Sequence, residues 1–176
     1  MSMKIHRIKE GEIIRTEEAA LCERETRIEI ERLSADGFKL ILKGVGVEKG
    51  YIPGVDLKGK IDSLDYLVTF DGKKIAWIDV TCSNYTFEGS RIMPVNYYKG
   101  EFIEKSDLPC FIVYSMEKEQ LSKKDKCVWI RGRDVIKSKD DWDDLGGKRQ
   151  HNYYTDKEDW VRGLESLISE LIRLMH

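Results

Sequence analysis

Two short apolar runs joined by Asp71-Gly72 constrain the fold of this chain more than any other stretch. Residues 66–70 and 75–80 are rich in β-branched and aromatic side chains, a composition typical of strands. An Asp-Gly pair between two such runs favours a tight turn, because both residue types accept the positive φ that the turn requires. The sequence therefore predicts an antiparallel hairpin.

The outer ends of this hairpin carry two carboxylates. Asp65 opens the first strand and Asp79 lies near the end of the second, and antiparallel pairing brings such positions together. Strand alternation places Asp79 and Thr81 on one face. Two close carboxylates repel each other unless a cation lies between them, and Mg²⁺ is commonly held by one or two carboxylates. The pair indicates either a metal site for phosphodiester chemistry or two aspartates at strand ends, where turn chemistry often places them.

The composition describes one soluble domain over residues 1–176. With a net charge of −2, a polyanion must be held by a local basic patch and not by overall charge. No apolar run approaches the roughly 20 residues that span a bilayer, and the N-terminus lacks a signal-peptide core, so we expect a cytoplasmic protein without membrane contact. The cysteines show neither zinc nor disulfide-framework spacing, and we expect them to be reduced and mostly buried: Cys22, Cys82, Cys110 and Cys127.

A helix is predicted before the hairpin, from Thr16 as N-cap to about residue 35, where Asp36-Gly37 favours its end. Glu25 and Glu29 fall inside its apolar arc, where a carboxylate is costly unless something pairs with it. Each of them either reaches water from the edge of the arc or points at the same cation as the aspartates.

Further elements are predicted after the hairpin from hydrophobic periodicity. They are a helix over residues 94–105, strands over 108–116 and 127–130, and an amphipathic helix over 157–175. The apolar stripe of the last helix packs on the core of its own chain or, alternatively, forms a homodimer interface.

Positive charge gathers in two segments of the second half of the chain. The first runs from Lys118 to Lys139, and the second, residues 146–154, mixes lysine and arginine with aromatic side chains and is expected to be flexible. Such segments are either solvated surface or contacts to the backbone and bases of a nucleic acid. Six residues are candidate contacts to nucleic acid. Arg91 precedes the 94–105 helix, and the others lie in the two basic segments: Lys123, Lys124, Lys126, Lys148 and Arg149.

The order of these elements and acids resembles the PD-(D/E)XK nuclease superfamily, within it the archaeal Holliday-junction resolvase-like branch, over roughly residues 16–136. The resemblance implies an α/β fold with a restriction-endonuclease-like αβββαβ core, a central mixed sheet flanked by helices, here followed by a C-terminal helix. Asp65 and Asp79 match the two strand acids of the family motif. Glu25 falls where a helical glutamate completes the metal site, and the carbonyl of Val80 is a further implied ligand.

Thr81 departs from the family pattern, because it stands where a lysine is usual. That lysine helps to polarise the attacking water and neutralises charge in the transition state, whereas a threonine hydroxyl brings no positive charge. Three explanations are open. Lys99 or Arg91 supplies the cation, the metal acts alone, or catalysis has been lost.

The acidic hairpin and the resemblance together predict a Mg²⁺-dependent endonuclease that hydrolyses DNA phosphodiester bonds, with branched or structured DNA as the implied substrate and Mn²⁺ as a substitute metal. The expected metal ligands are Asp65, Asp79, Val80 and Glu25, and the expected catalytic residues are Asp65, Asp79, Thr81 and Lys99. One alternative is a catalytically inactive nuclease-like module that binds nucleic acid or a protein partner. Another is an interaction domain that works through its C-terminal helix.

Overall fold

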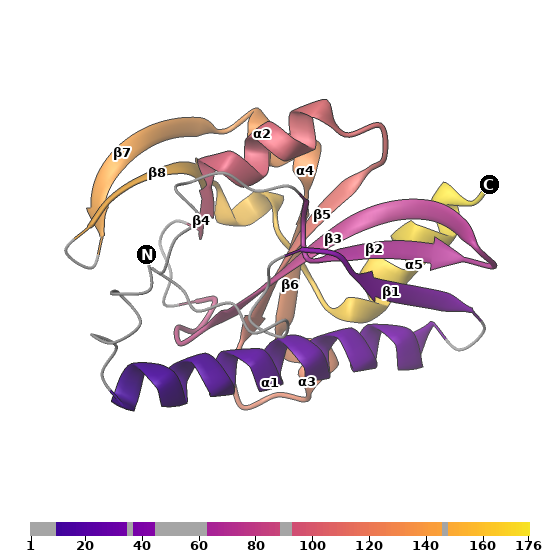
Figure 1. Ribbon diagram of the computed structural model, residues 1–176, viewed down its shortest axis with the longest axis horizontal. Coiled ribbons are helices and arrows are strands. Elements are labelled where there is room, and N and C mark those ends of the chain that lie inside the picture. The colour runs from indigo at the N-terminus through magenta and orange to yellow at the C-terminus, as the bar shows by residue number, and fades with distance from the viewer. Residues whose placement is uncertain (1–9, 35–36, 45–62, 89–92, 146–147) are drawn as a thin grey trace.

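The computed structural model describes residues 10–34, 37–44, 63–88, 93–145 and 148–176, and shows an α/β protein with a mixed central sheet (Figure 1). In this part of the chain the central sheet has six strands in the order β1-β2-β3-β5-β6-β9, and a smaller sheet has the order β4-β8-β7. The elements are α1 (Glu10–Leu33), β1 (Phe38–Leu42), β2 (Tyr66–Phe70), β3 (Lys73–Ser83), β4 (Met93–Asn96), α2 (Tyr97–Lys105), β5 (Cys110–Met116), α3 (Lys123–Lys126), β6 (Cys127–Arg131), α4 (Gly132–Ile136), β7 (Lys139–Leu145), β8 (Lys148–Thr155), a 3₁₀ turn (Lys157–Asp159), β9 (Val161–Arg162) and α5 (Leu164–Leu174).

The predicted hairpin is confirmed as β2 and β3. Asp71 has a φ of 50° and Gly72 a φ of 78°, the left-handed backbone that a tight Asp-Gly turn uses. Tyr66 pairs with Ile78 in the antiparallel register, so Asp65 and Asp79 follow as the next positions outward.

The strand β5 lies at the centre of the sheet and runs parallel to β3, with Thr81 beside Tyr114. A parallel pair needs a crossover, and α2 lies within it. As predicted, β5 is buried on both faces. Val113 belongs to the core shared with α1 and α5, whereas Ile112 belongs to the core under α2 and α4 (Figure 1).

The hairpin β7–β8 arches away from α2 at one end of the molecule (Figure 1). We expected residues 146–154 to form a flexible segment or a loop anchored by its tyrosines. Residues 148–154 instead lie in β8, which pairs with both β4 and β7, whereas residues 146–147 lie outside the described residues. The aromatic side chains explain the difference, because Tyr153 is buried against α2 at Gly100, where a β-carbon would overlap its ring.

Three predicted helix boundaries were also wrong. The first helix begins at Glu10 and not at Thr16. Pro94 lies in β4, and α2 begins at Tyr97 because the side chain of Asn96 caps it by accepting the N–H of Tyr98. The last helix begins only at Leu164, after a 3₁₀ turn and β9.

The helix α5 buries its apolar stripe in the core of its own chain. The fully or largely buried members of the stripe are Leu164, Leu167, Ile168 and Leu171, whereas Ile172 remains 42% exposed. Packing of this stripe within the chain removes the observation that pointed to a homodimer interface. Within the described ranges, every helix is too short or too polar to cross a bilayer.

Candidate active site

Asp65 and Asp79 lie together where β2 begins and β3 approaches its end, as the hairpin geometry predicts. Asp79 is only 3% exposed. One carboxylate oxygen of Asp65 accepts the backbone N–H of Val80 at 2.9 Å. We predicted the backbone carbonyl of Val80 as a metal ligand. The structure shows in addition that the backbone N–H of Val80 holds the Asp65 carboxylate beside Asp79.

The ammonium group of Lys99 completes this arrangement from α2. Its Nζ lies 2.7 Å from Oδ2 of Asp79 and 3.4 Å from Oγ1 of Thr81. A lysine from the crossover helix therefore lies beside Thr81, the position at which the resemblance led us to expect a lysine. Of our two candidate cations, Lys99 is in position, and Arg91 lies outside the described residues.

Burial and neighbouring carboxylates act in the same direction on the pKa of Asp65 and in opposite directions on the pKa of Lys99. Withdrawal from solvent raises the pKa of the Asp65 carboxyl well above its ordinary value, and the neighbouring charges of Asp79 and Glu23 raise it further. Burial alone lowers the pKa of Lys99, but the carboxylates of Asp79 and Asp65 outweigh it, so the pKa of Lys99 is raised. Lys99 is therefore a permanently charged group at neutral pH.

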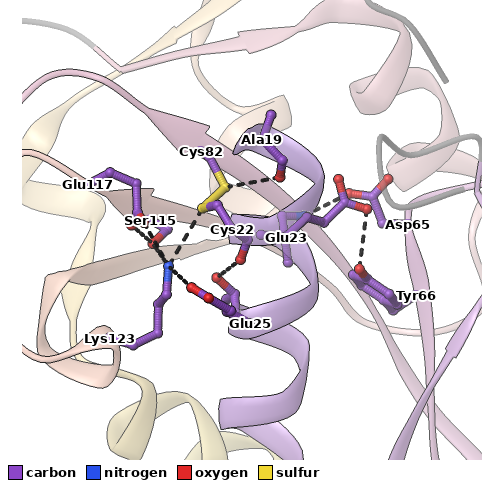
Figure 2. Close-up of a disulfide and its surroundings, with 12 residues drawn as sticks. Ala19, Cys22, Glu23, Glu25, Asp65, Tyr66, Cys82, Ser115, Glu117 and Lys123 are labelled. Atoms are coloured by element: carbon purple, nitrogen blue, oxygen red, sulfur yellow. Dashed lines mark hydrogen bonds and ion pairs between the residues drawn. A yellow bond between two sulfur atoms is a disulfide. The ribbon is translucent and has the colours of Figure 1, made fainter. Parts of the chain in front are cut away.

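The glutamate that lies beside Asp65 is Glu23, whereas Glu25, which we expected to complete the metal site, points toward Lys123 (Figure 2). Glu23 is 2% exposed, and its Oε1 accepts the hydroxyl of Tyr66 at 3.2 Å. Two positions along a helix differ by about 200°, so Glu25 points to the opposite side, where its carboxylate lies 3.8 Å from Lys123. Glu29, the other candidate, pairs with Arg32 at the surface.

A sequence signal for Glu23 existed. Glu23 lies about two helical turns before Ile30, which is fully buried in the core. The phase of the helix can therefore be fixed by Ile30 and Cys22, and not by Leu21, which is 46% exposed.

Cys22 and Cys82 form a disulfide, so the expectation of four reduced cysteines was wrong (Figure 2). The bond joins α1 to the end of β3 across a sequence separation of 60, and only the tertiary packing of the helix on the sheet reveals the pairing. Cys110 and Cys127 are free and buried as predicted, and burial raises the pKa of each thiol to about 11.

Tyr114 is a site residue that sequence reasoning missed. It lies beside Thr81 in the parallel register, and its hydroxyl donates to the backbone carbonyl of Pro94. Burial raises its pKa to about 12, so the hydroxyl stays neutral beside Lys99. No sequence pattern links residues 81 and 114, because their pairing depends on the crossover.

The predicted nucleic-acid contacts divide into two groups. Lys123 and Lys124 already pair with Glu117 and Glu165, each at 2.8 Å, and are less suited to phosphate than we expected. Lys126 is partly exposed at the end of α3, and Lys148 opens β8.

Arg149 is exposed and lies over the ring of Trp142 at 5.6 Å. Trp142 is 48% exposed and stacks on His151, which in turn stacks on Tyr97 at the start of α2. An exposed aromatic ring with an arginine beside it suits stacking with nucleic-acid bases. Asp140 also lies on this hairpin, 2.6 Å from His151, and it opposes binding of a polyanion.

The donor set of the acidic cluster fits a hard divalent cation. Asp65, Asp79 and Glu23 supply carboxylate oxygens, which Mg²⁺ prefers, and their combined charge exceeds that of Lys99. In the described ranges, no group of three histidine, cysteine, aspartate or glutamate side chains is placed so that it could hold a metal ion by itself.

Comparison with known proteins assigns no family to this chain. No protein-family model, curated protein or solved structure matches it.

Proposed function

We propose that this protein is a Mg²⁺-dependent endonuclease that hydrolyses phosphodiester bonds of DNA. The observation that carries the proposal is the position of Lys99, whose ammonium lies 2.7 Å from Asp79 and 3.4 Å from Thr81. Carboxylates that can hold a metal and a cation that can neutralise a phosphate are thereby combined in one place.

The order of elements supports the proposal. The helix α1, the strands β1, β2 and β3, the helix α2 and the strand β5 follow one another as in a restriction-endonuclease-like αβββαβ core, with β4 inserted before α2. Asp65 directly precedes the second strand of this series and Asp79 lies on the third, which agrees with the positions that the resemblance implies.

Each residue of the cluster has a role in the proposed reaction. Asp65 and Asp79 would hold the divalent ion, which when bound lowers the pKa of water and stabilises charge on phosphate oxygens. Lys99, charged at neutral pH, would donate a hydrogen bond to the scissile phosphate or to the attacking water and would not act as a base. The hydroxyl of Thr81 would orient the same water, and Glu23 would hold water or metal from the side of α1.

The hairpin β7–β8 provides the best-supported contact to DNA. Arg149 and Trp142 combine a positive charge with an exposed ring, and the chain of stacked rings leads from them to Tyr97, close to Lys99 in α2. We propose that this surface contacts unpaired or distorted nucleotides, which expose their bases for stacking.

The proposal is tested by incubating the protein with linear, single-stranded and four-way-junction DNA in Mg²⁺, Mn²⁺ or EDTA. Wild type is expected to cut in either metal and not in EDTA. Asp79→Ala is expected to lose cutting, whereas Asp107→Ala, at a surface position before β5, retains it. If Asp79→Ala cuts as well as wild type, the site is assigned wrongly.

A catalytically inactive module that binds nucleic acid or a protein partner is the second candidate, and a specific contact favours it. In the Lys99–Asp79 ion pair, a cation of the chain itself already balances part of the negative charge of the acidic cluster. This candidate predicts DNA binding that weakens steeply with salt and no cutting in either metal.

A further inference from the structure

The disulfide between Cys22 and Cys82 lies directly beside the candidate active site (Figure 2). Cys22 precedes Glu23 in α1, and Cys82 follows Thr81 in β3. The bond therefore ties together the helix and the strand that each contribute side chains to the acidic cluster.

The disulfide holds α1 at a point where its packing on the sheet is mostly polar. Glu23 is the inward residue here, and its contact with the sheet is the hydrogen bond of 3.2 Å that it accepts from the hydroxyl of Tyr66 in β2. The apolar anchor of α1 in the main core is Ile30, further along the helix, whereas Leu21 is exposed on the outside. Near Glu23, the disulfide is thus a covalent link between α1 and β3 among weaker polar contacts.

The two sulfur atoms differ in access. Cys22 is 4% exposed, whereas Cys82 is only partly buried. An external thiolate would therefore attack Sγ of Cys82, because attack on a disulfide requires an approach to the sulfur. The buried Cys110 and Cys127 are free thiols and lie in the core.

We infer that Cys22 and Cys82 form a reversible thiol–disulfide couple that accepts electrons from a dithiol, and that its reduction loosens α1 and withdraws Glu23 from the acidic cluster. A thiolate of the dithiol attacks Sγ of Cys82, the protein S–S bond breaks, and the sulfur of Cys22 leaves and takes a proton. The second thiolate of the reductant then attacks the mixed disulfide and releases Cys82, which also takes a proton. The protein gains two electrons and two protons, and the reductant becomes a disulfide.

The effect of reduction on metal binding and cleavage at the acidic cluster rests on the proposed function, but the loosening of α1 does not. The test therefore begins with measurements that need neither metal nor DNA. Air-oxidised protein is compared with protein reduced by dithiothreitol. Alkylation after denaturation is expected to label only Cys110 and Cys127 in the oxidised form and all four cysteines in the reduced form.

Amide hydrogen exchange and thermal unfolding then report the state of α1. In the reduced form we expect exchange of the amides of residues 17–27 to accelerate by about tenfold or more. The melting temperature should fall by roughly 5–10 °C. Exchange in β5, at the centre of the sheet, should change less than exchange in α1.

Two variants serve as controls. Cys22→Ala/Cys82→Ala should behave as the reduced form in both conditions and should no longer respond to dithiothreitol. Cys110→Ala keeps the disulfide and should respond as wild type does. The comparison of oxidised and reduced wild type remains decisive if either variant fails to fold.

Two results would overturn the inference: labelling of all four cysteines in air-oxidised protein, or unchanged exchange of α1 after reduction. Mn²⁺ titration and DNA cleavage in the two redox states then test the proposed function separately. We expect Mn²⁺ affinity and the cleavage rate to fall by about tenfold on reduction. If α1 loosens but neither form cuts DNA, the redox couple stands and the nuclease proposal fails. If α1 is unchanged and both forms cut equally, the nuclease stands and the couple fails.

Discussion

Lys99 on α2 donates a hydrogen bond of 2.7 Å to Asp79 on β3. The same ammonium lies 3.4 Å from the hydroxyl of Thr81. A helix therefore brings positive charge to a strand position at which the sequence itself has none. This relationship makes the nuclease proposal testable at single side chains.

Lys99→Met should reduce the rate of cleavage by about 10²–10³-fold, the usual effect of removing one preorganised donor to a developing negative charge. DNA affinity should change little, because the side chain is largely enclosed beside Asp79. Single-turnover cleavage and filter binding separate the two effects. Lys105→Met, on an exposed position of the same helix, is the matched control, and an equal loss in both variants would contradict the role of Lys99.

Moving the lysine from position 99 to position 81 should restore part of the cleavage activity that Lys99→Ala loses. Thr81→Lys alone places a second ammonium beside Lys99 and should lower stability by about 1 kcal/mol or more. Combined with Lys99→Ala, it should cut at least about tenfold faster than Lys99→Ala alone. Cleavage rates of the two single variants and the double variant check this. If the double variant cuts no faster than Lys99→Ala, a lysine at position 81 cannot replace the lysine at position 99.

Glu23→Gln should weaken Mn²⁺ binding by about 10–100-fold, the effect of losing a supporting carboxylate at a metal site. Glu25→Gln, on the opposite side of α1, should change it by no more than about twofold, because a surface ion pair contributes little. Calorimetric titration measures both. Equal affinities in the two variants would place the metal away from Glu23.

Asp65→Asn should stabilise the metal-free protein at neutral pH. Because the pKa of Asp65 is raised in the folded state, its contribution to stability is fully present below the ordinary value of 3.8 and is lost as the pH rises through the folded-state pKa. The amide keeps an acceptor for the N–H of Val80. Denaturant unfolding in EDTA should therefore show an advantage of the variant that grows as the pH rises from about 4.

Metal should reverse this order. Mg²⁺ is expected to stabilise wild type and to leave Asp65→Asn nearly unchanged, because binding to the folded state alone raises its stability. A variant less stable than wild type in EDTA at neutral pH would show that Val80 and Lys99 outweigh the burial of the Asp65 charge.

Local chemistry was sufficient to predict the hairpin and its acids. Asp71-Gly72 fixes the turn, and the turn fixes the register that brings Asp65 to Asp79. Lys99 was one of two candidate cations, with Arg91, because the resemblance implies a cation that Thr81 does not supply.

Features that depend on packing between distant elements could not be predicted in the same way. The phase of α1 decides between Glu23 and Glu25, and it follows from the sequence only when Ile30 and Cys22 are given more weight than Leu21. The disulfide of Cys22 with Cys82 and the contact of Tyr114 with Pro94 exist only after the helix, the sheet and the crossover have assembled.

The close approach of Tyr153 to Gly100 has a consequence for substrate binding. Because no β-carbon separates the ring from α2, the hairpin β7–β8 touches the helix directly beside Lys99. A ligand that displaces β8 also displaces the backbone that carries the site lysine. Under the nuclease proposal, nucleotides bound at Trp142 would therefore alter the rate of cleavage as well as the affinity, and DNA substrates of different shape would be distinguished by how fast they are cut.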